Sequence, residues 1–514
     1  MSVISKVKTI CFSGINVIDV DVEVHFTKGQ PGITIVGLGD KAVKESIDRV
    51  RASLATLGLI LPPQRITINL APADILKEGT HYDLPIILGI LSSMGVIKNT
   101  DIANYIVIGE LGLDASIRQV NGVLPTALHA CNKKLGIICP KDNGKESAWG
   151  GKDLNIIALD KLENLIKYFK GIIKVERPQI SQSELLIDSK KDMSDVKGQH
   201  TAKYAMEIAA AGGHNIILIG APGCGKSMLA SRIVTILPPL SIEEMIEVSM
   251  IHSISGLIKN GVLSSMRPFR APHHTASQYA LIGGGSKAKP GEITLAHNGV
   301  LFLDELPEYQ RDSLEALRQP METGEISITR VNNKVIYPAS FQLVAAMNPC
   351  KCGFYGSTKQ QCICSQKSVQ QYQSKISGPL LDRIDIHVRM EDVNYKFSEI
   401  TDNQVEKQEE NSETIKKRVI TARQIQRERY KNEHFKTNSQ CPEGQLLQQY
   451  CMPHNEECIK LLDEISEKLK VSMRGIGKIV RVARTIADLE NSQEVTKEHL
   501  LKASLFRQQL YNTF

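Results

Sequence analysis

A glycine-rich segment between an apolar run and a helix-compatible run carries the clearest chemistry in this sequence. The stretch IILIGAPGCGKSMLA, residues 216–230, satisfies G-x-x-x-x-G-K-[ST] at Gly220, Gly225, Lys226 and Ser227. Glycines let backbone N–H groups turn toward phosphate oxygens, and a helix start adds its positive dipole end. Lys226 adds a charge, and Ser227 can reach Mg²⁺. The pattern therefore predicts a nucleotide-phosphate site built from Gly220, Ala221, Pro222, Gly223, Cys224, Gly225, Lys226 and Ser227, in which the backbone of Cys224 matters more than its sulfur.

A second motif places two carboxylates at the end of an apolar strand. Residues 300–305 read VLFLDE, as in a buried parallel strand whose carboxyl end lies where α/β sheets bind ligands. Alone, this pair is more typical of a solvated loop. Together with the glycine-rich segment it predicts phosphoryl transfer, in which Asp304 and Ser227 hold Mg²⁺ and Glu305 orients and deprotonates the attacking water.

Two further positions extend this predicted site. The strand-like run FQLVAAMN ends in Asn348, whose amide can hydrogen-bond the γ-phosphate or the water. The run SGPLLDRIDIHV places Arg383 after a short helix-like stretch. This arginine is either a structural partner of Asp382 or Asp385, or a charge offered to the nucleotide of a neighbouring subunit.

Length and composition limit the class of protein. A chain of 514 residues with 42% hydrophobic and 23% charged residues predicts several globular domains. Lys and Arg exceed Asp and Glu by 62 to 56, which neither requires nor excludes nucleic acid. Eleven cysteines without a secretion signal favour a reducing, cytoplasmic location. The apolar run from Leu84 to Ile97, about 14 residues long, is too short to span a bilayer, so no membrane partner is expected.

The order of patterns predicts an α/β multidomain fold. Alternating β-like and helical stretches indicate an α+β domain over residues 1–175, followed by a polar linker over 176–199. A P-loop α/β core follows at 200–398. The acidic, amide-rich stretch 399–412 is expected to be a flexible loop, and residues 413–514 form a helical domain.

Four cysteines follow the strand that ends at Asn348. They form two C-x-C pairs in NPCKCGFYGSTKQQCICS: Cys350, Cys352, Cys362 and Cys364. Four thiolates at this spacing can close a tetrahedral Zn²⁺ site, although C-x-C is rarer than the usual zinc knuckle. The alternative is four reduced thiols in a loop.

These motifs together resemble an AAA+ ATPase and, more narrowly, the magnesium-chelatase-like ComM/YifB family. The resemblance lies in RPFRAPHHTASQYALIGGG, PGEITLAHNGVLFLDELPEY and VARTIADL, and it extends over essentially the whole chain. It implies ATP and Mg²⁺ as cofactors, Asn348 as sensor 1, Arg383 as the trans-acting arginine finger, and Arg474 in the helical lid as sensor 2. It also implies that Val196 lies near the adenine. Arg318 is the alternative finger, and a finger acting in trans implies a ring, by resemblance a homo-hexamer.

The N-terminal domain resembles the proteolytic domain of Lon without its catalytic pair. The resemblance lies in LAPADILKEGTHYDLPIILGIL and GELGLDASIRQVNGVLPTALHACNKKLGIICP. Lon-type hydrolysis needs a serine nucleophile and a lysine base, but these positions fall near His81 and Leu124. Neither residue can serve, and replacement by Ser92 or Lys133 would need a different geometry. We therefore expect a Lon-like fold with no peptidase dyad.

Three basic elements are candidates for contact with a phosphate backbone. The first is an insertion over residues 250–298 that carries Lys259, Arg267, Arg270, His273, His274, Lys287 and Lys289. For its two adjacent histidines, which should point in different directions, a loop role is preferred over metal binding. The second is a hairpin around Asn332–Asn333, flanked by Arg330 and Lys334. The third is a helix over residues 412–433 with Lys416, Lys417, Arg418, Arg423, Arg427, Arg429 and Lys431. Each of these is also consistent with ordinary solvated surface.

Three functions remain open from the sequence. The family resemblance implies an ATP-driven helicase or branch-migration motor that acts on single-stranded or branched DNA during recombination, in naturally competent cells. A motor subunit of a metal-chelatase complex is the second, and it would need a porphyrin-binding partner. A protein-remodelling ATPase with a degenerate protease domain is the third.

Overall fold

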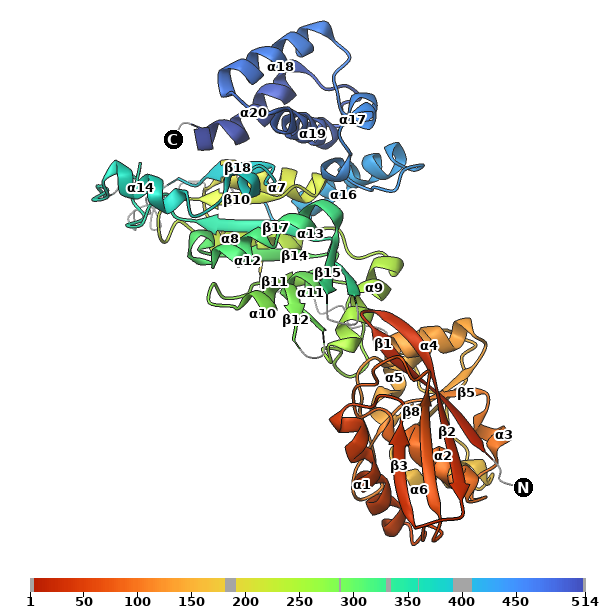
Figure 1. The fold of residues 1–514 in the computed structure, drawn as a ribbon. Coiled ribbons are helices and arrows are strands. Elements are labelled where there is room, and N and C mark those ends of the chain that lie inside the picture. Colours follow the sequence, from red (N-terminus) through yellow and green to blue (C-terminus); the bar gives the residue numbers. More distant parts are fainter. Residues whose placement is uncertain are drawn as a thin grey trace, which may run out of the picture.

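The computed structural model describes residues 4–180, 191–285, 288–329, 334–358, 360–391 and 409–511. Figure 1 shows an elongated molecule with the N-terminal domain at one end, the C-terminal helices at the other, and an α/β core between them. Within the described ranges, no helix combines the length and the apolar character that crossing a bilayer requires.

The N-terminal domain is built on a seven-stranded mixed sheet in the order β3-β4-β2-β1-β5-β8-β9. Its strands are β1 (Ser5–Ser13), β2 (Asn16–Thr27), β3 (Gly32–Val36), β4 (Arg65–Ala71), β5 (Tyr105–Val107), β8 (Gly136–Pro140) and β9 (Ile156–Leu159), with β6 (Glu110–Leu111) and β7 (Ile117–Arg118) as a separate pair. Its helices are α1 (Lys41–Thr56), α2 (Asp83–Ser93), α3 (Asn99–Ile102), α4 (Val123–Asn132), α5 (Gly144–Ser147) and α6 (Leu162–Phe169).

The apolar run that begins at Leu84 is the central helix of this domain. Residues 83–91 of α2 are all buried, and a Cβ at Gly89 would lie 2.7 Å from Val24 of β2. The buried carboxylate of Asp83 accepts hydrogen bonds from Arg49 Nε at 2.6 Å and from the backbone N–H of Leu111 at 3.1 Å. The run is therefore apolar because it lies inside the core of this domain.

The α/β core contains a five-stranded parallel sheet in the order β11-β14-β17-β10-β18. Its strands are β10 (Ile216–Ile219), β11 (Phe269–Arg270), β14 (Val300–Leu303), β17 (Gln342–Met347) and β18 (Ile386–Arg389), with the small pairs β12 (Gly283–Gly284) with β13 (Lys289–Pro290) and β15 (Glu325–Thr329) with β16 (Lys334–Pro338). Its helices are α7 (His200–Gly212), α8 (Lys226–Ile236), α9 (Ile242–Ile254), α10 (Gln278–Ile282), α11 (Glu292–Leu295), α12 (Arg311–Glu315), α13 (Arg318–Thr323), α14 (Gln366–Gln373) and α15 (Gly378–Leu381).

Successive residues of the central strands face two different hydrophobic cores. Ile216, Leu218, Val344 and Ala346 join the core that includes α7, α8 and the C-terminal helices. Ile217, Leu343 and Ala345 join a second core with α12, α13 and the β15–β16 hairpin. Burial on both faces explains why these strands are continuous apolar runs.

The strand order places the glycine-rich segment at the point where the sheet changes direction. β10 lies between β17 and β18, although β10 precedes both in the chain. In open α/β sheets, ligands bind at the carboxyl ends of the strands beside such a switch point. Residues 220–227 follow β10 at this edge, next to the ends of β14 and β17.

Two predicted connecting segments lie partly outside the described residues. Within the 176–199 linker, residues 181–190 are outside them, whereas residues 192–199 pack on the core: Met193 is buried, and Asp192 Oδ1 accepts from Ser412 N at 3.1 Å. Of the acidic loop at 399–412, residues 399–408 are outside. Glu409 pairs with Lys203 of α7. Residues 192–199 and 409–412 therefore both lie against the surface of the α/β core.

The C-terminal domain is helical, as predicted, and contacts the core through a buried ion pair. It consists of α16 (Ser412–Arg429), α17 (Gln445–Tyr450), α18 (Glu456–Leu469), α19 (Met473–Leu489) and α20 (Lys497–Tyr511). Lys478 Nζ on α19 lies 2.6 Å from Asp385 Oδ1, beside β18, and His214 Nδ1 lies 3.7 Å from the other oxygen. Burial opposes ionisation of Asp385, but Lys478 and His214 outweigh it and lower the carboxyl pKa.

We expect Asp385→Asn to destabilise the protein by about 3–5 kcal/mol at pH 7, because it leaves Lys478 charged and buried without its partner. Since the folded pKa of Asp385 is lowered, the wild-type contribution is complete above about pH 4 and is lost as the pH falls through that folded pKa. Urea unfolding at several pH values measures both effects. The double variant Asp385→Asn/Lys478→Met should recover most of the loss; equal instability of the single and double variants would contradict this account.

Candidate active site

The loop between β10 and α8 has the backbone that the glycine-rich pattern predicts. Gly223 and Gly225 have φ of +77° and +93°, a region that residues with a Cβ rarely adopt, and a Cβ at either position would meet open space. Gly225 is the residue before α8, which begins at Lys226. The loop thus presents glycine backbone and a helix N-terminus to an accessible surface, which is the form of a phosphate cradle.

Lys226 is buried and directed at the loop and at the end of the neighbouring strand. Its Nζ donates to the carbonyl oxygens of Gly220 at 2.8 Å and Ala221 at 2.9 Å, and to Asn348 Oδ1 at 3.0 Å. The structure therefore brings Asn348, predicted from its place after β17, to the lysine of the phosphate loop. Both groups can contact the terminal phosphate of a nucleotide.

The two predicted Mg²⁺ ligands also meet. Ser227 Oγ lies 2.5 Å from Asp304 Oδ2, and the other oxygen of Asp304 accepts from the N–H of Glu305 at 2.9 Å. A hydroxyl and a carboxylate oxygen at one point are the hard oxygen ligands that Mg²⁺ prefers. These residues fit Mg²⁺ bound together with nucleotide phosphates.

Glu305 is held by a histidine whose role was not predicted. Its φ of +51° is rare for a residue other than glycine, and its Oε2 lies 3.0 Å from Nδ1 of His274. The ring of His274 packs against that of His273 with centroids 4.1 Å apart, so the expectation that the two rings point in different directions was wrong. His274 therefore positions the candidate catalytic carboxylate and is not a free charge on a loop.

Gln199, the residue before α7, also contacts the phosphate loop. Its side-chain N–H₂ donates to the carbonyl of Glu391 at 2.7 Å and, more weakly, to that of Cys224 at 3.4 Å. Val196, predicted to lie near the adenine, is 3% exposed and belongs to the same core as Met193. Its side chain is packed into that core, and its nearness to the adenine stays a prediction.

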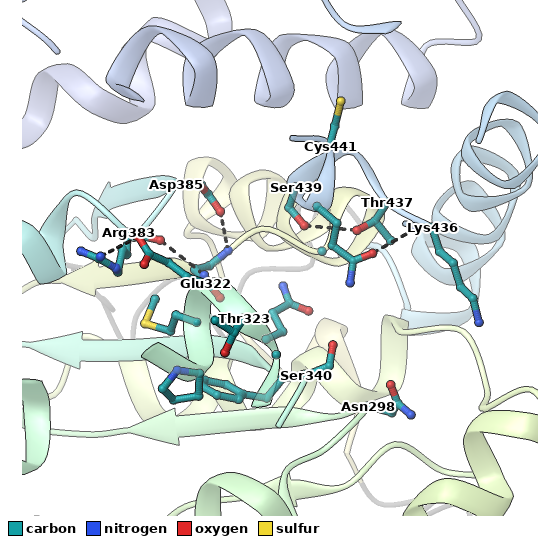
Figure 2. A pocket seen from close by; sticks show the side chains of 18 of the residues that line it. Asn298, Glu322, Thr323, Ser340, Arg383, Asp385, Lys436, Thr437, Ser439 and Cys441 are labelled. Atoms are coloured by element: carbon teal, nitrogen blue, oxygen red, sulfur yellow. Dashed lines mark hydrogen bonds and ion pairs between the residues drawn. The ribbon is translucent and has the colours of Figure 1, made fainter. Parts of the chain in front are cut away.

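Arg383 and Arg474 come together in a pocket that includes none of the phosphate-loop residues. A cavity of about 850 Å³ lies between the core and the C-terminal helices (Figure 2), and both arginines line it. Arg383 Nη2 lies 2.5 Å and Arg474 Nη2 3.5 Å from the same oxygen of Glu322 on α13. The sequence offered Asp382 or Asp385 as an ion-pair partner of Arg383. In the structure, Asp385 pairs with Lys478 instead, and Asp382 lies 3.5 Å from Arg507.

Arg318, the alternative finger, is the first residue of α13 and pairs at 2.7 Å with Glu315, the last residue of α12. It therefore shares no carboxylate with Arg474. Of the two candidates, Arg383 is the one that the fold combines with an arginine of the C-terminal domain.

Several basic residues proposed for a phosphate backbone are instead used inside the fold. Arg267 donates to the carbonyls of Pro238 and Asn298, and Arg270 forms a bidentate pair with Glu292. The segment is also not a pure insertion, because Phe269–Arg270 is strand β11 of the main sheet. In α16, the inward-facing arginines are Arg418, bound to Glu207, Arg423, bound to the Ala210 carbonyl, and Arg429, bound to Asp488.

The hairpin agrees with its prediction over the described residues. β15 and β16 are antiparallel with Thr329 opposite Lys334, and Lys334 is exposed. The predicted turn, with Arg330, Asn332 and Asn333, and Lys287 of the insertion lie outside the described residues. The β1–β2 turn of the N-terminal domain approaches this hairpin, because a Cβ at Gly14 would lie 2.9 Å from the Ile336 carbonyl oxygen.

The two positions aligned with a peptidase dyad have other contacts. His81 is buried against the Ile10 carbonyl at 3.0 Å, and burial lowers its pKa to about 4. The N–H of Leu124 donates to Glu146 at 3.1 Å, which accepts from Ser253 of α9. Lys133 is paired with Asp19. These residues serve the domain core and its contact with α9.

Comparisons with known proteins cover nearly the whole chain. The family model for magnesium chelatase, subunit ChlI, matches residues 192–398, its C-terminal counterpart matches 409–507, and a third ChlI model matches 22–143. The YifB protein of Salmonella typhimurium is 41% identical over 494 residues, covering 96% of this chain and 95% of that protein. The competence protein ComM of Haemophilus influenzae is 39% identical over 495 residues, covering 95% and 94%. The maternal DNA replication licensing factor mcm6 of Xenopus tropicalis is 24% identical over 219 residues, covering 41% and 25%.

Proposed function

Because this chain belongs to the ComM/YifB family of magnesium-chelatase-like AAA+ ATPases, we propose that it is a DNA motor. It hydrolyses ATP in a homo-hexameric ring and drives unwinding or branch migration of recombination intermediates, including those formed in natural transformation. The observation that carries the proposal is the convergence of Lys226, Asn348, Ser227, Asp304 and Glu305 at one edge of the core sheet.

The proposed chemistry follows from the position of each group. The phosphate loop and Lys226 bind and orient the β- and γ-phosphates, and Asn348 fixes the terminal phosphate or the water. Mg²⁺, held by Ser227 and Asp304, would neutralise charge on the phosphates. Glu305 takes the proton of the attacking water, and His274 sets the direction of its carboxylate. Zinc is the additional metal that we propose, at the four-cysteine group.

The ring is supported by the separation of the two arginines from the phosphate loop. Arg383 and Arg474 line a pocket that includes none of the phosphate-loop residues, so in a closed ring they would serve the nucleotide of the adjacent subunit. A positive charge supplied across a subunit boundary stabilises the charge that develops on the transferred phosphoryl group. Hydrolysis then depends on assembly.

DNA as the partner is supported by the relatives and by the hairpin. One relative is named a competence protein and a more distant one a DNA replication licensing factor. The β15–β16 hairpin packs on the same core as β17 and carries the exposed Lys334 at its described end. Placed in a central channel, such a hairpin would follow a phosphate backbone by charge.

The test is the ATPase rate with and without single-stranded or forked DNA, together with strand displacement. Wild-type protein should be stimulated by DNA, and Lys334→Glu should lose most of that stimulation while its basal rate is kept. Lys44→Glu, on α1 of the N-terminal domain, is a matched charge reversal that should behave as wild type. Absence of stimulation by any DNA, with stimulation by unfolded protein, would instead favour a protein-remodelling ATPase.

A further inference from the structure

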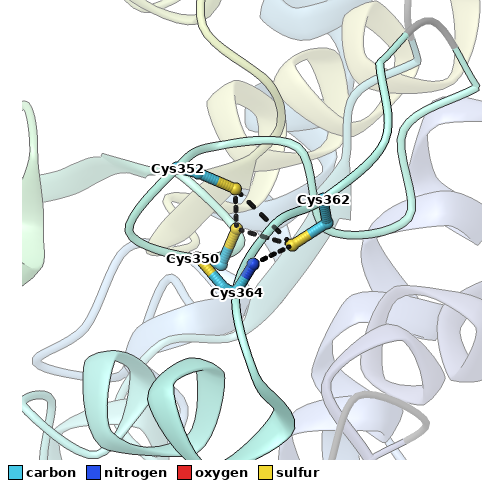
Figure 3. A group of neighbouring side chains, drawn as sticks. All are labelled: Cys350, Cys352, Cys362 and Cys364. Atoms are coloured by element: carbon cyan, nitrogen blue, oxygen red, sulfur yellow. Dashed lines mark hydrogen bonds between the residues drawn. The ribbon is translucent and has the colours of Figure 1, made fainter.

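Four cysteines from the two ends of one loop meet at a single point. The loop leaves β17 through Asn348, and Figure 3 shows Cys350 and Cys352 from its outgoing end facing Cys362 and Cys364 from its return. The four sulfur atoms lie within 4.8 Å of one another. Three of the separations are 3.4 Å for Cys350–Cys352, 3.7 Å for Cys350–Cys362 and 3.5 Å for Cys352–Cys362.

These separations are those of ligands around one ion. Sulfurs at about 2.3 Å from a tetrahedral Zn²⁺ lie about 3.8 Å apart, whereas a disulfide brings two sulfurs to about 2.05 Å. All four cysteines are free of disulfides. Four thiolates in a tetrahedral set select Zn²⁺ or iron, and a set with no open position is typical of a structural zinc site.

The same loop is pressed against the phosphate loop. Gly353, between the two cysteine pairs, has φ of +88°, and a Cβ there would lie 2.5 Å from Cδ of Pro222. Its N–H donates to the Cys350 carbonyl at 3.0 Å, which closes a tight turn around the first cysteine pair. The cysteine loop is thus in direct contact with the residue that follows Gly220 and Ala221.

Two other contacts fix the loop to the core. Arg389 at the end of β18 donates to the Tyr355 carbonyl at 3.1 Å, and Gln373 of α14 donates to the Pro349 carbonyl at 2.9 Å. Pro349 directly follows Asn348. The loop therefore links the strand end that carries Asn348 to the backbone of the phosphate loop.

We propose that Cys350, Cys352, Cys362 and Cys364 form a closed structural zinc centre that holds Asn348 and Pro222 in register for nucleotide binding. The zinc assignment stands on the sulfur geometry alone. The link to nucleotide rests on the proposed ATPase function. A metal bound by four thiolates would fix both ends of this loop, which the turns closed by Gly353 and Ser357 and the contacts to Arg389 and Gln373 also hold.

The metal assignment is tested on the full-length protein by elemental analysis and by cobalt substitution. Wild-type protein should contain about one zinc per chain and, with Co²⁺ instead, show the absorption of tetrahedral cobalt thiolate. The double variant Cys362→Ser/Cys364→Ser should lose the zinc, whereas Cys131→Ser, a half-buried cysteine of the N-terminal domain, should keep it. Iron with acid-labile sulfide, no bound metal, or zinc retained by the double variant would each overturn the assignment.

The link to nucleotide is tested separately with Gly353→Ala, which leaves all four ligands in place. The added Cβ must displace Pro222 or the turn, so we expect zinc content to stay at about one per chain and the Kd for a fluorescent ATP analogue to rise about tenfold. Gly378→Ala, where a Cβ meets open space, is the control. Unchanged affinity in Gly353→Ala would overturn the link but not the zinc centre, and neither readout depends on DNA.

Discussion

Glu305→Gln is expected to lower the rate of ATP hydrolysis by about 10²–10⁴-fold while ATP still binds. Glutamine keeps the shape of the side chain but cannot take a proton from water. The proposed phosphate contacts come from the loop, Lys226 and Asn348, and the substitution leaves the hydrogen bonds among these residues in place. Phosphate release under multiple-turnover conditions and the binding of a fluorescent ATP analogue measure the two parts of this prediction.

Glu308→Gln is the matched control, because it removes a carboxylate three residues further along. Glu308 pairs with Lys375 at 3.2 Å and does not contact His274 or Asp304 in the described residues. It should hydrolyse ATP at close to the wild-type rate. Equal losses in both variants would mean that the carboxylates act through the local fold, and Glu305 would no longer be the candidate base.

Arg383→Ala should reduce hydrolysis by about 10³–10⁵-fold, the effect of removing an arginine finger. Subunits that carry Arg383→Ala should still bind ATP, because their own phosphate loop is intact. Mixing Arg383→Ala subunits with Lys226→Ala subunits should restore activity above that of either alone. In such rings some sites combine an intact phosphate loop with an intact neighbouring arginine.

Two other variants show whether the loss is specific. Lys436→Ala removes a charge from the same pocket without breaking a contact to Glu322 and should keep activity. Arg318→Ala tests the alternative finger and should also remain active, since Arg318 pairs with Glu315 at the end of the preceding helix, α12. Loss in Arg318→Ala but not in Arg383→Ala, or no recovery on mixing, would contradict the assignment.

The parts of the site that follow apolar strands could be predicted from sequence. Gly220 to Ser227, Asp304 and Asn348 each come directly after a buried strand, and parallel strands end at the same edge. The position of each residue directly after an apolar strand was therefore enough to predict that these residues lie close together. The helical C-terminal domain and the β15–β16 pair were likewise visible in periodicity and turn residues.

The partners supplied by distant segments could not be predicted. His274 reaches Glu305 only because β11, a strand of two residues, pairs with β14. So short a strand carries no periodic signal, and its segment looked like an insertion. Glu322 was also missed, because its meeting with Arg383 and Arg474 depends on how α13 and α19 pack across the pocket.

Charge counts along the sequence did not show which basic side chains form ion pairs within the fold. Arg267, Arg270 and Arg418 looked like unpaired surface charge, but each pairs with a carboxylate 22 or more residues away along the chain: Glu244, Glu292 and Glu207. A count of basic and acidic residues within one segment does not show which carboxylate each arginine contacts in the fold. Lys334 remains a candidate because it is exposed at the end of a hairpin.

The shared core of β17 and the hairpin has a mechanical consequence. One face of β17, through Leu343 and Ala345, packs with Ile326 and Val335 of β15–β16, and the same strand leads directly into Asn348. If cleavage of the γ-phosphate displaced that strand, the displacement would reach the hairpin through this shared core, because close-packed interiors transmit strain. The conformational change of the proposed motor would therefore be small. It would pass laterally through the sheet to the hairpin and would need no large domain rotation.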